Sequence, residues 1–336
     1  MRRAAGSARA GAGGDAGGER PGAGAERPGQ IPARGWVQIL RRAMTSAKED
    51  GISLAAAGVA FYSFLAIFPA MIAALALYGL LAEPSQVQQQ VSSVSGALPA
   101  QARQILETQL KALAGGRQGA LTLGLVVSVL LALWSASGGI AGLMQAINLA
   151  YGERETRGFA KRRGTALLLT LGAIVFVLLS VALVAVLPAV LGKLGLGVAA
   201  RAGVQVVRWA LLLAFVMIAL AVAYRFAPDR RSPRIRWVSL GAALATALWI
   251  IGSVAFSLYV SNFGRYEQTY GAIAGVIILL LWLYLSSYTV LLGAEVNAET
   301  EHQTAADTTV GEPRRIGERG AVKADTVPRE DGPAGA

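Results

Sequence analysis

The chain has 336 residues, of which 54% are hydrophobic and 15% charged, with a mean hydropathy of +0.50 and a net charge of +11. A soluble domain of this length does not need so much apolar surface, so the excess predicts insertion into a membrane. There is no cysteine, which excludes disulfides, thiolate catalysis and cysteine-ligated metals.

The N-terminal part reads as a tail followed by an interfacial helix. Residues 1–35 are rich in Gly, Ala, Arg and Pro and lack the apolar core of a signal peptide, so we expect a disordered cytoplasmic tail. Residues 36–50 mix basic side chains with the apolar residues Trp36, Val37, Ile39, Leu40 and Met44. This pattern favours a helix that lies on the inner membrane surface.

Six apolar runs of membrane length follow, at residues 52–81, 120–148, 165–191, 204–227, 237–259 and 272–294. Aliphatic blocks such as 277–281 favour helices over the ~10-residue alternating strands of a β-barrel. The sequence therefore predicts an all-α fold, a polytopic bundle of six transmembrane helices. We assign residues 36–298 to this membrane domain.

The positive charge could indicate nucleic acid, so its location decides its meaning. Residues 1–35 carry six basic and three acidic groups and residues 299–336 carry five and eight, so the two ends cancel. Thirteen Lys and Arg residues fall on one side of the predicted spans, in 41–48, 154–163 and 225–236, and seven on the other. The positive-inside rule then places both termini in the cytoplasm. We expect contact with anionic lipid and no nucleic-acid partner.

The first span carries one face of mostly small side chains and a proline that predicts a kink. The residues at this helical spacing are Ala55, Gly58, Tyr62, Ala66, Pro69 and Ala73. Such a face either packs closely against another helix or lines a translocation path. The outer loop at 83–118 has the spacing of two amphipathic helices, which would form a packed lid or a substrate gate.

The second span changes from aliphatic to small and polar side chains before it ends at Asn148. Ser135, Gly139, Gly142 and Ala146 fall on one face. Two adjacent glycines inside a membrane helix weaken it, so they indicate close backbone contact, a bend or a cavity wall.

The last span carries polar groups on one helical face, which should look into the bundle because hydroxyls within a membrane need partners. The residues of this face are Tyr284, Ser287, Tyr288, Leu291, Glu295 and Glu299. Asn297 lies beside them. Glu295 is the one carboxylate close to the inner end of a span, where it either serves a pathway or proton relay or acts as an anchor or ion pair.

Catalytic motifs are missing from the chain. The single histidine, His302, lies in residues 299–336, which we expect to be a second disordered cytoplasmic tail. There is no HExxH, CxxC or GxxxxGK[ST] motif. We therefore expect no enzyme activity, no cofactor and no metal.

Three segments resemble a known family when they are taken together. They are DGISLAAAGVAFYSFLAIFP at 50–69, LWSASGGIAGLMQAINLAYGERETRGFAKRR at 133–163, and residues 224–299. The combination is similar to the YihY/BrkB family of bacterial inner-membrane proteins, formerly grouped under a ribonuclease BN label. The resemblance implies a six-helix, multi-pass protein of the bacterial inner membrane without an established activity, with transport and virulence-related roles suggested for some members.

Two functional hypotheses follow. The first is a transporter or flippase-like protein that moves a small or lipidic substrate through a cavity lined by spans 1, 2 and 6, whose faces are small and polar. The second is a non-catalytic structural or assembly factor of the envelope that binds lipids or partner proteins. Expected partners are membrane lipids, with a second copy of the chain or envelope proteins as further candidates.

Overall fold

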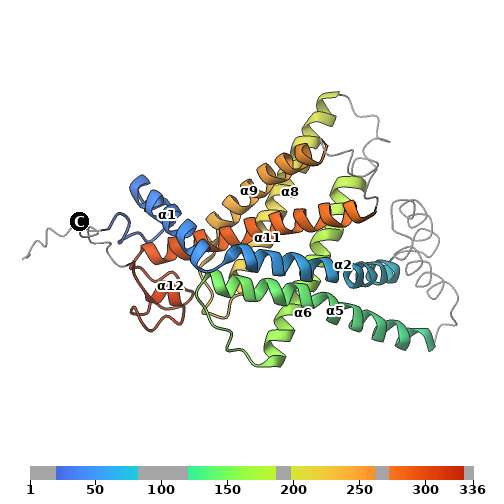
Figure 1. Cartoon of the computed structure of the whole chain (residues 1–336), viewed down its shortest axis with the longest axis horizontal. Helices are drawn as coiled ribbons and strands as arrows, with labels where there is room; N and C mark the ends of the chain where they lie inside the picture. Colours follow the sequence, from blue (N-terminus) through green and yellow to red (C-terminus); the bar gives the residue numbers. More distant parts are fainter. Residues whose placement is uncertain (1–19, 82–119, 187–197, 262–271, 329–336) are drawn as a thin grey trace, which may run out of the picture.

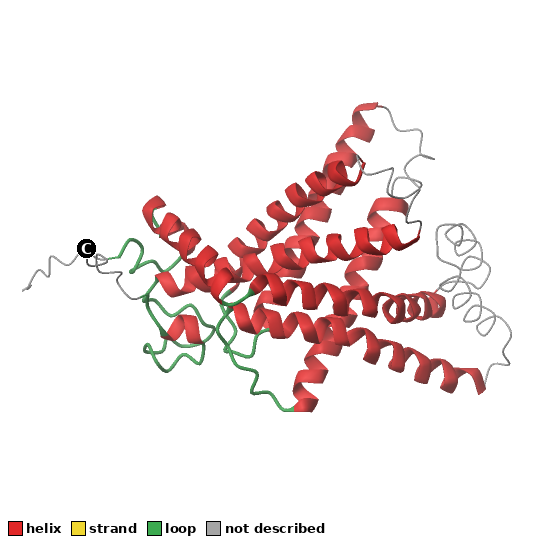
Figure 2. Ribbon diagram, in the orientation of Figure 1, coloured by secondary structure: helices red, strands yellow, loops and turns green. Residues whose placement is uncertain are grey.

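The computed structural model of the chain describes residues 20–81, 120–186, 198–261 and 272–328. The predicted outer loop at 83–118 lies outside the described residues. Figure 2 shows that the described chain is helical, with loops gathered mainly at one end. The only described pairing of strand type is an isolated bridge between Pro233 and Thr309.

Along the chain, two shorter helices come first, six long helices follow, and a short helix comes last (Figure 1). Their bounds are η1 Pro28–Gln30, α1 Ala33–Glu49, α2 Ile52–Leu81, α5 Ala120–Ala150, α6 Phe159–Val181, the π-helical turn η2 Ala182–Val186, α8 Val198–Phe226, α9 Ile235–Ser261, α11 Ala272–Gln303 and α12 Val322–Asp325. Within the described residues, six helices are long and apolar enough to cross a membrane. The prediction of an all-α fold with six spans is confirmed.

The long helices form because their backbone groups are paired internally while their side chains meet lipid-like surroundings. Large apolar side chains remain exposed along them, including Leu168 at 72%, Val206 at 71% and Ile251 at 65%. In a water-soluble bundle such residues would turn inward. Their exposure on α6, α8 and α9 is what a helix in hydrocarbon requires.

The packed core lies in one half of the bundle. Most of the buried apolar residues of α2, α5, α9 and α11 belong to the helix halves near Ile52, Met144, Trp237 and Leu291. Away from this half the long helices diverge, with α8 and α9 rising and α5 falling in Figure 1. The bundle is therefore tight at one end and spread at the other.

Helices α9 and α11 cross at two glycines, and this contact fixes the bundle at its tight end. A Cβ at Gly241 would overlap the carbonyl oxygen of Gly293, and a Cβ at Gly293 would overlap the Tyr224 hydroxyl and the carbonyl oxygen of Gly241. Only glycine permits backbones to approach this closely. The Tyr224 hydroxyl donates a hydrogen bond to the Val290 carbonyl oxygen at 2.7 Å, which joins α8 to the same crossing.

The amphipathic pattern before the first span forms α1, whose buried residues recur one turn apart at Gly35, Ile39, Ala43 and Ala47. Ile39 and Ala43 pack with Trp237 of α9 and Val296 of α11. The opposite face leaves Val37, Leu40 and Met44 exposed. The helix therefore binds the bundle through one apolar face and presents a second one outward.

The two segments predicted as disordered tails are ordered over their described parts, which differs from the sequence prediction. The Thr304 hydroxyl donates to the Ala25 carbonyl oxygen at 2.6 Å, and the Arg20 guanidinium donates to the Pro328 carbonyl oxygen at 3.3 Å. Thr308 and Thr309 are fully buried. Polar composition suggested disorder, but these residues find partners in each other and in the loops of the bundle.

Candidate functional site

The ion pairs among the described residues gather at the tight end of the bundle, which α1 and α12 mark on the left of Figure 1. We call this region the polar end, and it comprises residues 20–53, 148–163, 224–239 and 295–328. It is the side on which the sequence places thirteen Lys and Arg residues. Both described ends of the chain lie there, since residues 20–25 contact residues 303–305.

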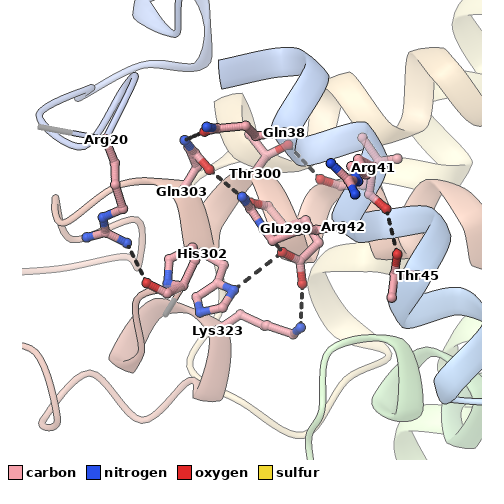
Figure 3. Close-up of polar contacts among 12 residues, drawn as sticks. Arg20, Gln38, Arg41, Arg42, Thr45, Glu299, Thr300, His302, Gln303 and Lys323 are labelled. Carbon is pink, nitrogen blue, oxygen red and sulfur yellow. Dashed lines mark hydrogen bonds and ion pairs between the residues drawn. The ribbon is translucent and has the colours of Figure 1, made fainter. Parts of the chain in front are cut away.

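Glu299 of α11 is the centre of one ionic cluster (Figure 3). Its carboxylate accepts from Arg42 Nε at 2.7 Å and from Lys323 Nζ at 2.6 Å, and His302 Nδ1 lies 3.3 Å away. The side chain of Glu299 is only 2% exposed. Because a buried carboxylate needs such compensation, the cluster fastens α1 and α12 to α11.

Gln303 extends the cluster to the N-terminal segment (Figure 3). Its side-chain oxygen accepts from Arg42 Nη2 at 2.5 Å, and its nitrogen donates to the Pro21 carbonyl oxygen at 2.7 Å and to Gln38 Oε1 at 3.2 Å. One amide therefore joins α11 to both α1 and the N-terminal segment.

Arg230 and Glu301 form a second pair, with both side chains fully buried. Arg230 Nη2 lies 2.6 Å from Glu301 Oε2, which also accepts from the Thr308 hydroxyl at 2.7 Å. The guanidinium lies 4.8 Å from the ring centre of Tyr151. The pair ties the α8–α9 loop to the end of α11.

The third network joins the α5–α6 loop to the α8–α9 loop. Asn148 accepts from the Asp229 backbone N–H at 2.7 Å and donates to Glu155 at 3.2 Å. Arg157 donates to Glu155 twice at 2.7 Å and to the Ala227 carbonyl oxygen at 2.8 Å. The hydrogen bond from Arg157 is the main cause that holds the pKa of Glu155 below its ordinary range.

Asn297, predicted as a candidate site residue, holds the α9–α11 crossing. Its side-chain oxygen accepts from the Gly241 backbone N–H at 2.8 Å and its nitrogen donates to the Val238 carbonyl oxygen at 3.3 Å. It is fully buried. The amide therefore satisfies backbone groups of α9 where the two helices touch.

Glu295 faces the interior, as its position on the helical face of α11 predicts. It is fully buried, and among the described residues no hydrogen-bond donor reaches either carboxylate oxygen. The group within hydrogen-bonding reach is another carboxyl, that of Asp50. No hydrogen-bonded ion pair of Glu295 is present among the described residues.

The aromatic residues of the same α11 face, which precede Glu295 in the helix, lie against α2. The Tyr284 hydroxyl and the Ser53 hydroxyl share a hydrogen bond of 2.8 Å, and the rings of Tyr284 and Tyr288 lie 6.1 Å apart. Both tyrosines pack on the main core. Trp282 points away from this face and contacts Trp249 of α9.

The small faces of spans 1 and 2 meet each other. A Cβ at Gly139 would lie 3.1 Å from Ala66 Cβ and 3.3 Å from the Tyr62 carbonyl oxygen, so α2 and α5 pack backbone against backbone. Ser135 is exposed and lies outside this contact, and Pro69 is half-buried within an unbroken α2.

Two cavities border the α2–α5 contact. The larger, of about 400 Å³, lies between α2, α5 and α6 and is lined almost wholly by apolar atoms. These helices are spans 1, 2 and 3, so its lining differs from the predicted cavity of spans 1, 2 and 6. Its lining includes Ala66, Gly139, Thr170, Ala173 and Val177. The smaller, of about 230 Å³, lies beside Tyr62 and Gln145. Of the predicted site residues, Gly139 lines the larger cavity and Tyr62 the smaller, whereas Asn148, Glu295 and Asn297 belong to the polar end.

Several residues of the polar end were missed by the sequence reasoning, chiefly Glu301, Gln303 and Lys323. One signal for them was present, because Glu295, Glu299 and His302 continue the helical face of the last span past its apolar end. In the described part of the chain, no group of three or more His, Asp or Glu side chains could hold a metal ion.

The fold and site together define a polytopic membrane protein with six spans and a charged, closed end. A family model described as "Virulence factor BrkB" matches residues 43–316. The chain therefore belongs to the BrkB family, as its sequence segments suggest.

Relatives of the chain are bacterial proteins. The ribonuclease-like protein YfkH of Bacillus subtilis is 33% identical over 247 residues, which cover 72% of this chain and 87% of that protein. A UPF0761 membrane protein of Tolumonas auensis is 47% identical over 66 residues, or 19% of this chain and 22% of its own, and one of Alteromonas mediterranea is 47% identical over 79 residues, or 24% and 26%. These two matches each span about a quarter of the relative. No solved structure matches the chain.

Proposed function

We propose that this protein is a lipid-moving, flippase-like transporter of the bacterial inner membrane, without enzymatic activity. The observation that carries the proposal is the cavity between α2, α5 and α6. Its volume of about 400 Å³ falls within the ~300–1,000 Å³ range of ligand pockets. It opens at the surface of helices that cross the membrane, where lipid is the neighbour.

The lining of the cavity favours an acyl chain over a small polar solute. Thr170 supplies one of its two hydroxyls, and that hydroxyl already donates to the Ala166 carbonyl oxygen at 2.7 Å. A polar solute would lose its bonds to water here and find at most the Ser63 hydroxyl as a replacement. An acyl chain has no such bonds to lose.

Cationic groups lie on the same face of α6 as the cavity lining. Arg163 precedes Thr170 by seven residues, or about 10 Å along a helix. Its guanidinium lies 4.0 Å from the ring centre of Trp134 and donates to the Trp134 carbonyl oxygen. An anionic headgroup near Arg163 would therefore direct its acyl chain toward the cavity.

A scrambling assay tests this function. The full chain is reconstituted in vesicles of phosphatidylglycerol and phosphatidylethanolamine that carry a fluorescent phospholipid, and outer-leaflet label is destroyed with dithionite. We expect the loss of fluorescence to exceed that of protein-free vesicles. Ala173→Trp should suppress the excess because it fills the cavity, whereas Leu168→Trp adds the same indole to an exposed position of α6 and should not. Equal behaviour of the two variants would contradict a path through this cavity.

The alternative is a non-catalytic envelope factor that binds lipids or partner proteins. The close contact of Gly139 with α2 favours it, because a packed α2–α5 interface suits a static scaffold. This alternative predicts vesicle fluorescence equal to the protein-free control for the wild type and both tryptophan variants.

A further inference from the structure

Asp50 is placed by the turn between α1 and α2. It caps the C-terminus of α1, with its backbone N–H donating to the Ser46 carbonyl oxygen at 2.7 Å. Gly51 follows with φ of +64°, a left-handed conformation that reverses the chain into α2. The Asp50 side chain, half-buried, then lies against α11 at Glu295.

The contact between Asp50 and Glu295 requires a proton. Ionised carboxylates have only lone pairs, so two of them within hydrogen-bonding reach repel unless one carries a hydrogen. Glu295 is fully buried, and none of the described donors reaches either of its oxygens. Among the described residues, Glu295 can therefore form a hydrogen bond only through a proton that it shares with Asp50.

The surrounding charges do not replace this proton. Glu49 of α1 and Glu299 of α11 add negative charge near Asp50. Tyr151, which follows α5, lies close enough to Glu295 for its hydroxyl to be affected by the Glu295 charge. Lys323 of α12 is the nearby cation, but its ammonium group is bound to Glu299 Oε1 at 2.6 Å.

The environment of Asp50 agrees with a shared proton. Burial raises the pKa of Asp50, the Lys323 charge and the contact with Glu295 lower it, and Glu49 and Glu299 raise it, with a net increase above 3.8. A carboxyl whose pKa is raised in this way keeps its proton to higher pH than an exposed aspartate.

We propose that Asp50 and Glu295 form a binding site for a single proton, held as a carboxyl–carboxylate pair that joins the α1–α2 turn to α11. Asp50 is its half-exposed member and exchanges the proton with water, while Glu295 is its buried member. When the proton leaves, two negative charges face each other and push the start of α2 from α11.

The site has a consequence for transport, which rests on the proposed function. Helix α2 carries Ser63, Ala66 and Ala70 of the cavity wall. Movement of α2 at Asp50 would therefore change the cavity, so proton binding would be coupled to lipid movement. The proton site itself does not depend on this link.

Infrared difference spectroscopy tests the site directly. The full chain in lipid nanodiscs is titrated over roughly pH 5–9, a window in which exposed Asp and Glu carboxyls stay ionised. We expect a protonated carboxyl band in the wild type at neutral pH, which shifts in D₂O. The band should disappear in both Asp50→Asn and Glu295→Gln, because the introduced amide donates to the remaining carboxylate in place of the shared proton.

Glu299→Gln is the matched control, since Glu299 is paired with Arg42 and Lys323, and it should keep the band. Circular dichroism checks that each variant folds. If a variant fails to fold, carbon-13 labelling of the wild-type glutamate or aspartate carboxyls shows whether the band belongs to these residue types. Absence of the band from the wild type, or its persistence in both folded variants, would overturn the proposal. Vesicles without scrambling but with an intact band would reject the transport function alone.

Discussion

Replacing Arg230 by methionine should destabilise the protein strongly. The exposed fraction of both the Arg230 and Glu301 side chains is 0%, so water does not screen the pair. Removing one partner of a buried pair costs about 3–5 kcal/mol, because the other charge is left without compensation. The remaining hydrogen bond from Thr308 to Glu301 places our expectation in the lower half of that range.

The double variant Arg230→Met/Glu301→Leu separates the charge from the packing. Arg230 Nη1 and Glu301 Oε1 have no hydrogen-bond partner among the described residues, so the native pair is incompletely satisfied. Replacing such a pair by apolar groups is often neutral or stabilising. We therefore expect the double variant to recover most of the stability that the single variant loses.

The free energy of unfolding would be measured on the full chain in detergent micelles by titration with a denaturing detergent, followed by tryptophan fluorescence. Arg42→Met is a second control, because Arg42 is 27% exposed and Glu299 keeps Lys323 as a partner, so about 1 kcal/mol or less should be lost. The reasoning is refuted if Arg230→Met costs no more than Arg42→Met, or if the double variant is as unstable as the single one.

Three further changes probe other contacts. Gly241→Ala should cost at least about 1–3 kcal/mol by overpacking against the Gly293 carbonyl oxygen, whereas Gly275→Ala, with open space around it, should leave the unfolding midpoint nearly unchanged. Burial raises the pKa of Asp229, but the hydrogen bonds from Thr156 and the charge of Arg157 lower it by more, so its pKa in the folded protein is below 3.8. Ionised Asp229 therefore stabilises the fold above pH 3.8, and this stabilisation is lost as the pH falls through the folded pKa. Asp229→Asn should therefore flatten the acid limb of a plot of stability against pH, and an unchanged limb would contradict this assignment. Lys323→Met should release α12 from Glu299, seen as faster proteolysis near residues 304–328 while the spans stay intact, and equal cleavage of variant and wild type would argue against this anchor.

The spans could be predicted because a helix in lipid needs apolar side chains along its whole length, and such a requirement is visible in the sequence as a continuous apolar run. The run at 52–81 became α2 with the same bounds, but α6 begins at Phe159, six residues before the predicted start. The apolar run begins only after Lys161, Arg162 and Arg163, yet a helix can include such residues because long basic side chains extend from a helix end toward water. Helix α11 likewise continues past the apolar run because Glu299 and Glu301 find cations.

The polar end could be predicted only in part. Asn148, Glu295 and Asn297 were named from their place at span ends, and the structure buries all three. Their partners come from far along the chain, such as Asp229 for Asn148 and Gly241 for Asn297. Local pattern carries no information on such pairs. Ser135 shows a limit of local pattern of another kind. Residues four apart differ by about 40° in direction around a helix, so Ser135 lies outside the contact that Gly139 makes with α2.

The hydrogen bonds between the first and last described segments set the order in which the molecule is completed. Ala25 accepts from Thr304, which lies 279 positions later in the chain, and Gln303 donates to Pro21 across 282 positions. A ribosome delivers these partners only after every span has been synthesised, so the N-terminal segment must wait for nearly the whole of translation before it docks. Closure of the polar end is thus a late step of biogenesis, and a chain that stalls after its sixth span would be inserted but left unsealed.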